Sequence, residues 1–229
     1  MSSVVATLKP RKSPVQARSA ATVETLHIAV IQVLTREGLS RCTTTRIAER
    51  AGMSVGSLYQ YYPNRDALLA AVLKKHLEGV AGAVEHACGE HRGKPVSQMA
   101  SALVTALLAA KLRDPEESKA LYAVAEGRGG ATLVARMHTR IVAAIAALLA
   151  SAPDARFDDP AMTSTVAFTA LMGPVRALLE GRAPAGFEAR LKGQLVVLLT
   201  AFLQAHHLGP ENLGVPAAGC YRISSDTAA

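Results

Sequence analysis

Residues 43–69, TTTRIAERAGMSVGSLYQYYPNRDALL, constrain the fold more than any other part of the chain. Thr43, Ser54 and Asn64 each stand where a side-chain oxygen can cap the first turn of a helix. Gly52 lies between the first two of these helices, where a left-handed residue costs least if it is glycine. The stretch therefore predicts two short helices joined by a tight turn and followed at once by a third helix, which is the helix-turn-helix arrangement.

A helix-turn-helix leaves the outer face of its second helix free to enter the major groove of DNA. Here Leu58 and Tyr62 have a spacing of four, and we expect both to point inward. Two further tyrosines and a glutamine remain on this short helix, which has no acidic residue. Helix capping alone does not explain that composition, so the stretch predicts a DNA-binding element.

Positive charge is concentrated in the same part of the chain. Residues 1–65 contain nine Lys and Arg against three acidic residues, so they carry +6 of the net charge of +7. A local excess of this kind is expected of a surface that meets DNA phosphates. Its coincidence with a helix-turn-helix strengthens the interpretation.

The composition predicts an all-α, cytoplasmic protein. Half of the 229 residues are hydrophobic, Ala and Leu predominate, and hairpin signals are nearly absent. Cys42, Cys88 and Cys220 are far apart and form no CxxC motif, which is typical of a reducing compartment. No signal peptide is visible, and the apolar runs Ile141–Ala150 and Leu195–Leu203 are too short to span a bilayer.

The stretch 43–69 resembles the TetR family of bacterial transcription regulators. The matching residues are Thr43, Ile47, Ala48, Ala51, Gly52, Met53, Ser54, Gly56, Ser57, Leu58, Tyr59, Tyr61, Asp66, Leu68 and Leu69. Tyr62 and Arg65 depart mildly from the family pattern, which usually has Phe and Lys there. The resemblance implies an N-terminal three-helix head with the helix-turn-helix and a C-terminal helical bundle for ligand binding and dimerisation.

We expect four regions along the chain. They are a flexible basic arm (1–16), a helix-turn-helix DNA-binding domain (17–63), a helical effector-binding and dimerisation domain (64–208) and a loose tail (209–229). The arm is either disordered without function or a further contact to DNA. Outside the helix-turn-helix, the expected helices cover residues 17–37, 64 to beyond 77, 97–112, 115–126, 132–149, 162–181 and 187–207.

The resemblance also implies which side chains contact DNA. The set comprises Thr43, Thr44, Thr45, Arg46, Val55, Gly56, Ser57, Tyr59, Gln60, Tyr61 and Arg65. The threonines and Arg46 would lie near a phosphate and the groove edge, where free amides at a helix N-terminus favour an anion. In the second helix, Val55 would contact a thymine methyl and Gln60 would read adenine, whereas Tyr59 and Arg65 would hold phosphates.

Small residues recur along one face of each of the last two long helices. They are Ala167, Ala170, Gly173 and Ala177 in the first helix, and Gly193, Val197, Ala201 and Ala205 in the second. Such a pair can meet its copy across a two-fold axis and form a four-helix bundle, or it can pack within one subunit. The resembling family dimerises through these helices, which favours a homodimer whose two DNA-binding elements face an inverted-repeat operator.

In proteins of the resembling family, the fourth to seventh helices enclose a ligand cavity. The candidate lining residues are Met99, Leu103, Leu107, Tyr122, Met137, His138, Phe168 and Met172, each of which could instead be plain core. The chain has no Trp and few aromatic residues. The expected effector is therefore a small apolar or amphiphilic molecule rather than a flat aromatic one.

Other classes of function have weaker support. His76, His86 and His91 could be imagined with Cys88 and Glu90 as a metal site, but the histidines lack i, i+4 ligand spacing, so we expect exposed surface histidines and no metal or cofactor. No nucleophile elbow, phosphate-binding glycine loop or HExxH motif suggests an enzyme. The expected function is a transcriptional repressor released by a small-molecule effector. The alternative is an architectural DNA-binding protein of the same fold without an effector.

Overall fold

The computed structural model describes residues 17–127 and 129–207, which are all-helical as expected. The predicted arm (1–16), the tail (209–229) and Cys220 lie outside the described residues. The elements are α1 (Ala17–Glu37), the short 3-10 helix η1 (Leu39–Arg41), α2 (Thr44–Arg50), α3 (Val55–Tyr61), α4 (Arg65–Glu90), α5 (Val96–Leu112), α6 (Pro115–Ala125), α7 (Gly130–Leu149), α8 (Pro160–Leu179) and α9 (Phe187–His207).

The helix boundaries follow the residues that the sequence singles out. The side-chain oxygens of Thr43, Ser54 and Asn64 each accept a hydrogen bond from the backbone N–H three residues on, and so cap α2, α3 and α4. Gly52 adopts the left-handed backbone conformation with φ of 67°. The predicted α1 and α9 have the observed bounds, which confirms those two helices.

Three helices of the C-terminal part begin one or two residues before their predicted starts. In α8 the reason is visible, since Asp159 accepts from the backbone N–H of Met162 at 2.9 Å and Pro160 occupies the first helical position. The missing N–H of proline costs nothing at that position. In contrast, Gly79 and Gly82 do not interrupt α4, which continues to Glu90.

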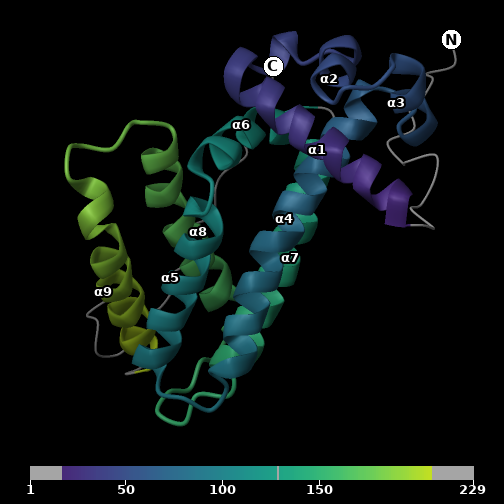
Figure 1. Cartoon of the computed structure of the whole chain (residues 1–229). Coiled ribbons are helices and arrows are strands. Elements are labelled where there is room, and N and C mark those ends of the chain that lie inside the picture. Colours follow the sequence, from purple (N-terminus) through teal and green to yellow (C-terminus); the bar gives the residue numbers. More distant parts are fainter. Residues whose placement is uncertain (1–16, 128, 208–229) are drawn as a thin grey trace, which may run out of the picture.

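The N-terminal elements α1, η1, α2 and α3 form the head (residues 17–61), which lies at one end of the molecule (Figure 1). Leu26 and Val30 of α1, Ile47 of α2 and Leu58 of α3 are buried together with Tyr62 in one hydrophobic cluster. The inward positions of Leu58 and Tyr62 confirm the prediction from their spacing. One consequence is that the opposite side of α3 is turned to solvent.

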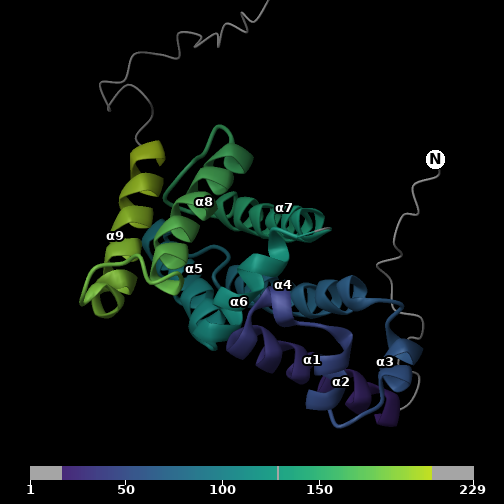
Figure 2. The ribbon, with the colours of Figure 1, turned by 90° about the horizontal axis from the view of Figure 1, so that it is seen from above.

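The helices α4 to α9 form the body (residues 65–207). The long helix α4 packs along α5 and α7, α8 packs between α7 and α9, and α5 also contacts α9 (Figures 1 and 2). The short helix α6 lies at the junction, where it contacts α1 and η1 of the head as well as α4, α7 and α8 of the body. Head and body are therefore joined by α4 through the chain and by α6 through packing.

By length and apolar composition alone, α7 and α8 could each cross a membrane. The expectation that no segment is long enough to span a bilayer considered only uninterrupted apolar runs, and it does not hold for these two whole helices. Both helices nevertheless pack within the bundle. In the middle of α7, Arg140 forms two hydrogen bonds of 3.0 and 2.7 Å to the carboxylate of Glu85 on α4. An arginine at that depth is expensive in a bilayer, so we interpret α7 and α8 as bundle helices.

Candidate functional site

The exposed face of α3 is the first candidate site. Ser54 accepts from the backbone N–H of Ser57 at 3.1 Å and its hydroxyl lies 2.9 Å from that of Ser57, which fixes the first turn. Of the residues expected to contact DNA, Gly56, Tyr59 and Gln60 are exposed. Val55, Ser57 and Tyr61 are half-buried, and Val55 and Tyr61 also pack against the core. The helix thus offers a neutral surface with amide and hydroxyl groups and no acid.

The N-terminus of α2 lies next to this face. The hydroxyls of Thr44 and Tyr59 are 3.5 Å apart, so the start of α2 and the middle of α3 form one continuous surface. Thr45 is exposed, and Arg46 is exposed but forms an ion pair with Glu37 at the end of α1. This arrangement brings together Thr44 and Tyr59, two of the residues for which the family resemblance implies phosphate contacts.

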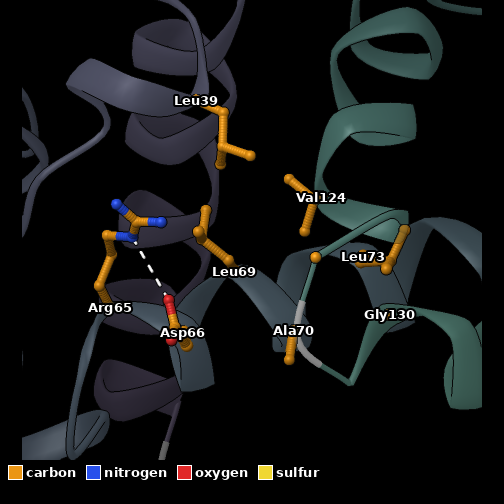
Figure 3. A pocket seen from close by; sticks show the side chains of 9 residues that line it. Leu39, Arg65, Asp66, Leu69, Ala70, Leu73, Val124 and Gly130 are labelled. Carbon is orange, nitrogen blue, oxygen red and sulfur yellow. Dashed lines mark ion pairs between the residues drawn. The ribbon is translucent and has the colours of Figure 1, made fainter.

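Arg65 has a different environment at the start of α4. Its Nε lies 3.4 Å from a carboxylate oxygen of Asp66, and its side chain lines a small cavity of about 60 Å³ between η1, α4 and the α6–α7 turn. Figure 3 shows this cavity, with Leu39 on the head side and Val124 and Gly130 on the body side. Arg65 therefore lies where the head meets the body, close to the end of α3.

A buried polar pair connects α1 to the end of α3. The Tyr62 hydroxyl and His27 Nε2 share a hydrogen bond of 2.8 Å, while His27 Nδ1 has no partner among the residues that the structure describes. Burial lowers the pKa of His27 and raises the pKa of Tyr62 to about 12. The pair is therefore neutral near pH 7, and it holds the C-terminus of α3 against α1.

The second candidate site is a cavity of about 790 Å³ between α4, α5, α6, α7 and α8. Its volume is in the range of small-molecule sites, which is roughly 300–1,000 Å³. The expected lining residues Tyr122, Met137, His138, Phe168 and Met172 do face it. Its wall is mainly apolar and is completed by side chains that include Leu73, Leu77, Leu121, Val134 and Ala135.

The assignment of three α5 residues to this cavity was wrong. Met99, Leu103 and Leu107 are buried in the core and do not line the cavity. The reason is that α5 packs between α4 and α9, so its apolar stripe is covered by helices along most of its length. Only Lys111, in the last turn of α5, reaches the cavity wall.

Lys111 belongs to a buried polar group that the sequence analysis missed. Lys111 is 4% exposed, and its Nζ lies 3.5 Å from His76 Nε2 and 4.8 Å from the centre of the Tyr122 ring. His76 Nδ1 lies 3.0 Å from a carboxylate oxygen of Glu117. These contacts connect α4, α5 and α6 at one end of the cavity.

Burial changes the acid–base properties of this group. It lowers the pKa of Lys111 to about 8, against a smaller opposing effect of Glu117. The hydrogen bond with His76 lowers the pKa of Glu117. The Tyr122 hydroxyl is buried without a hydrogen-bond partner among the described residues, and burial raises its pKa.

A signal for these residues was present in the sequence. Lys111 follows Leu107 by four positions and so continues the apolar stripe of α5, and His76 follows Val72 by four positions in α4. His76 is buried, which corrects the expectation of a surface histidine. His86 is exposed and pairs with Glu90 at 3.4 Å, and in the part of the chain that the structure describes no three potential metal ligands gather.

An apolar surface lies on the outer side of α8 and α9. Met162 and Val166 of α8 and Val197 and Leu198 of α9 are exposed, and Val197 is 64% exposed. Of the small residues predicted at a dimer interface, Ala170, Gly173, Gly193 and Ala201 are exposed, and Ala177 and Ala205 are half-buried. Ala167 is 2% exposed and was wrongly placed on this face, because it shares the buried side of α8 with Leu171 one turn later.

A helix-turn-helix head joined to a helical body with a ligand-sized cavity defines a class of DNA-binding regulators. Two family models match the chain: "Bacterial regulatory proteins, tetR family" over residues 29–72 and "Tetracyclin repressor-like, C-terminal domain" over residues 95–203. The chain belongs to the TetR family of transcriptional regulators. A comparison with curated proteins gives no match.

Solved structures show the same fold at low sequence identity. A candidate TetR-family regulator from Mesorhizobium loti has a TM-score of 0.66 and 17% identity, over 83% of this chain and 98% of that one. The multidrug efflux pump repressor SmeT of Stenotrophomonas maltophilia has a TM-score of 0.64 and 17% identity, over 86% and 94%. FadR of Bacillus subtilis, in complex with stearoyl-CoA, has a TM-score of 0.64 and 12% identity, over 78% and 98%.

Proposed function

We propose that this protein is a cytoplasmic repressor that binds an inverted-repeat operator as a homodimer and is released by a small apolar or amphiphilic effector. It needs no cofactor and no membrane. The observation that carries the proposal is that the helices lining the cavity also hold the head. Leu73, His76 and Leu77 of α4 and Ser118, Leu121 and Tyr122 of α6 form part of the cavity wall, while both helices contact α1.

This arrangement allows an effector to change the position of α3. Because α4 begins shortly after the end of α3, any tilt of α4 moves the DNA-binding surface. Moving the protein from mostly DNA-bound to mostly free requires that the effector prefer the free conformation by about 5 kcal/mol. Because the cavity of about 790 Å³ is lined in part by α4 and α6, shifts of these two helices alter its shape, so an effector can bind the two conformations with different affinity.

Two proteins of similar fold support an effector-responsive protein. SmeT is the repressor of a multidrug efflux pump, and the structure of B. subtilis FadR is that of a complex with stearoyl-CoA. The architectural alternative, with the same fold and no effector, has no comparable observation in its favour, since a DNA-binding protein without an effector has no use for a ligand-sized cavity in its body.

The exposed apolar face of α8 and α9 supports the proposed homodimer. An exposed apolar patch on a helical pair supports an interaction site, and a second copy would bury it. Binding to an inverted repeat then requires the two heads to lie one turn of DNA apart, about 35 Å. Val197→Glu should convert the dimer to a monomer in sedimentation equilibrium, whereas Ala109→Glu, on the exposed side of α5, should not. A Val197→Glu protein that remains dimeric would exclude this interface.

The DNA-binding part is tested with purified full-length protein. Selection from random duplexes should yield an inverted repeat, and fluorescence anisotropy with that duplex then gives affinities for its single-base variants. Gln60→Ala should lose preference at one base position per half-site. Tyr59→Phe and Arg65→Ala should weaken binding to all variants alike, and Gln98→Ala on the body is the matched control.

The effector part uses the same duplex and a panel of apolar and amphiphilic compounds. We expect at least one compound to release the DNA from the wild-type protein. Val134→Trp, which fills the cavity from α7, should bind the duplex normally but no longer respond. If Gln60→Ala loses affinity equally for every operator variant, the base-reading assignment is wrong, and if no compound changes DNA affinity, the architectural alternative is favoured.

A further inference from the structure

Two cationic side chains that line the cavity of about 790 Å³, Arg176 and Lys111, differ in burial and in ion pairing. Arg176 is half exposed and pairs with Glu126 at 2.8 Å and Glu180 at 2.6 Å, and its guanidinium lies 5.1 Å from the centre of the Tyr122 ring. Lys111 is almost completely buried, and among the described residues no carboxylate pairs with it. The interior of the cavity therefore carries one cation whose charge is not neutralised by a direct partner.

The contacts of Lys111 leave part of its hydrogen-bonding capacity unused. An ammonium group has three N–H donors, and here one points to His76 Nε2 at 3.5 Å while the charge lies over the Tyr122 ring. Tyr122 lines the same cavity, and its buried hydroxyl is also without a partner among the described residues. A buried ammonium without an anion is costly, and an unpartnered buried hydroxyl adds to that cost.

Another part of the wall is apolar. Val134 and Met137 of α7 and Phe168 and Met172 of α8 face the same cavity and offer no charge. A ligand that matches both parts has an apolar body along α7 and α8 and a negatively charged end at Lys111.

We propose that the effector is an amphiphilic organic anion, such as a carboxylate with an alkyl body, whose charged group binds Lys111 and the Tyr122 hydroxyl. This inference rests on the proposed effector function of the cavity. A cationic amphiphile would meet Lys111 without a free carboxylate to bind, because Glu126 is exposed and already paired with Arg176. A neutral amphiphile would leave the ammonium as it is.

The same contact gives the anion a way to act on the head. Lys111 is now held to His76 of α4, and His76 is held to Glu117 of α6. An anion that binds the unused N–H donors of Nζ attracts the ammonium and so weakens its 3.5 Å contact with His76. This changes the contacts of both helices that connect the cavity to the head. The polar group thus makes the positions of α4 and α6 dependent on the ligand's charge.

The test uses calorimetry at pH 7 with the full chain and three probes of equal alkyl length: dodecanoate, dodecan-1-ol and dodecyltrimethylammonium, each as dispersed monomers. Wild-type protein should bind dodecanoate at least about tenfold more tightly than dodecan-1-ol, since a hydrogen-bonded charge pair contributes that much or more. It should bind the cation most weakly.

Two variants and a control locate the effect. Lys111→Met keeps the length of the side chain and removes its charge, so the affinity for dodecanoate should fall to that for dodecan-1-ol while the alcohol still binds. Tyr122→Phe should lower the affinity for dodecanoate by a smaller factor. Lys119→Met, on the exposed side of α6, should change neither affinity, and circular dichroism checks that each variant is folded.

The outcomes separate this inference from the proposed function. Equal affinities for dodecanoate and dodecan-1-ol overturn the inference, and so does a preference for dodecanoate that survives Lys111→Met. If both probes nevertheless release operator DNA, the proposed function stands. Selective binding of dodecanoate through Lys111 without DNA release supports the inference and contradicts effector release. Binding of none of the probes overturns the inference.

Discussion

The hydrogen bond between His27 and Tyr62 gives the sharpest prediction about the head, because one atom can be removed from it. Tyr62→Phe deletes the hydroxyl that lies 2.8 Å from His27 Nε2. Since Nδ1 already lacks a partner among the described residues, the variant contains a buried imidazole with both nitrogens unpaired. Leaving a buried polar group unsatisfied costs about 1–3 kcal/mol, and we expect the free energy of unfolding to fall by that amount.

The double variant decides whether the cost arises from the orphaned imidazole. His27→Leu with Tyr62→Phe replaces both partners by apolar side chains, a change that can be nearly neutral. The double variant should therefore be more stable than Tyr62→Phe alone. Urea denaturation gives the free energy of unfolding of the wild type, Tyr62→Phe, His27→Leu and the double variant. All four are measured at one protein concentration, because the stability of a dimer depends on concentration. A double variant less stable than either single variant would refute the reasoning.

The same pair predicts a pH dependence. Burial lowers the pKa of His27 in the folded protein below its ordinary value of 6.5, with a smaller contribution from Lys75. Below pH 6.5 the unfolded chain therefore binds a proton that the folded protein does not, so the stability is complete above that pH and is lost as the pH falls towards the folded-state pKa. His27→Leu should flatten this part of the stability profile. A profile that is unchanged in the variant would assign the acid sensitivity to other groups.

Three further predictions concern the body. Gly130→Ala should lower the free energy of unfolding by about 1–3 kcal/mol, because the new Cβ would lie 2.3 Å from the backbone oxygen of Ala125. Thermal denaturation measures this effect, and an unchanged midpoint temperature would contradict the prediction. Asp154→Ala should cost about 1 kcal/mol in urea denaturation, since the carboxylate accepts from the Val96 N–H at 3.1 Å, and Asp154→Asn should retain most of that stability. Dodecanoate binding should weaken above pH 8, because burial lowers the pKa of Lys111 to about 8, whereas Lys111→Arg should bind equally at pH 7 and pH 9.

The sequence could predict the helices because their ends depend on local chemistry. Thr43, Ser54 and Asn64 cap the elements that follow them through hydrogen bonds to residues three positions on, and such contacts are written in the sequence itself. The cap of α5 is different. Pro95 has no side-chain oxygen, and the N–H of Val96 is satisfied by Asp154, which is 58 positions away, so no local pattern could indicate it.

The two candidate sites also differ in how far local sequence patterns could predict them. The exposed face of α3 follows from the inward spacing of Leu58 and Tyr62, and the family pattern adds the rest. The cavity could be predicted only in part, because an apolar stripe shows that a helix face is covered but not by what. On α5 the stripe of Met99, Leu103 and Leu107 is covered by other helices, whereas on α7 and α8 the residues Met137 and Phe168 face the cavity.

The informative positions were those where an apolar stripe contains a polar residue. Lys111 and His76 continue the buried faces of α5 and α4, and a folded protein retains such residues at a cost that apolar replacements would avoid. A lysine at the end of an apolar stripe therefore poses a question that the stripe itself does not: what neutralises the charge. In this fold the direct contacts of the ammonium within the described chain are an imidazole and an aromatic ring, and the carboxylate of Glu117 lies on the far side of that imidazole, so we propose an anionic ligand as the direct partner.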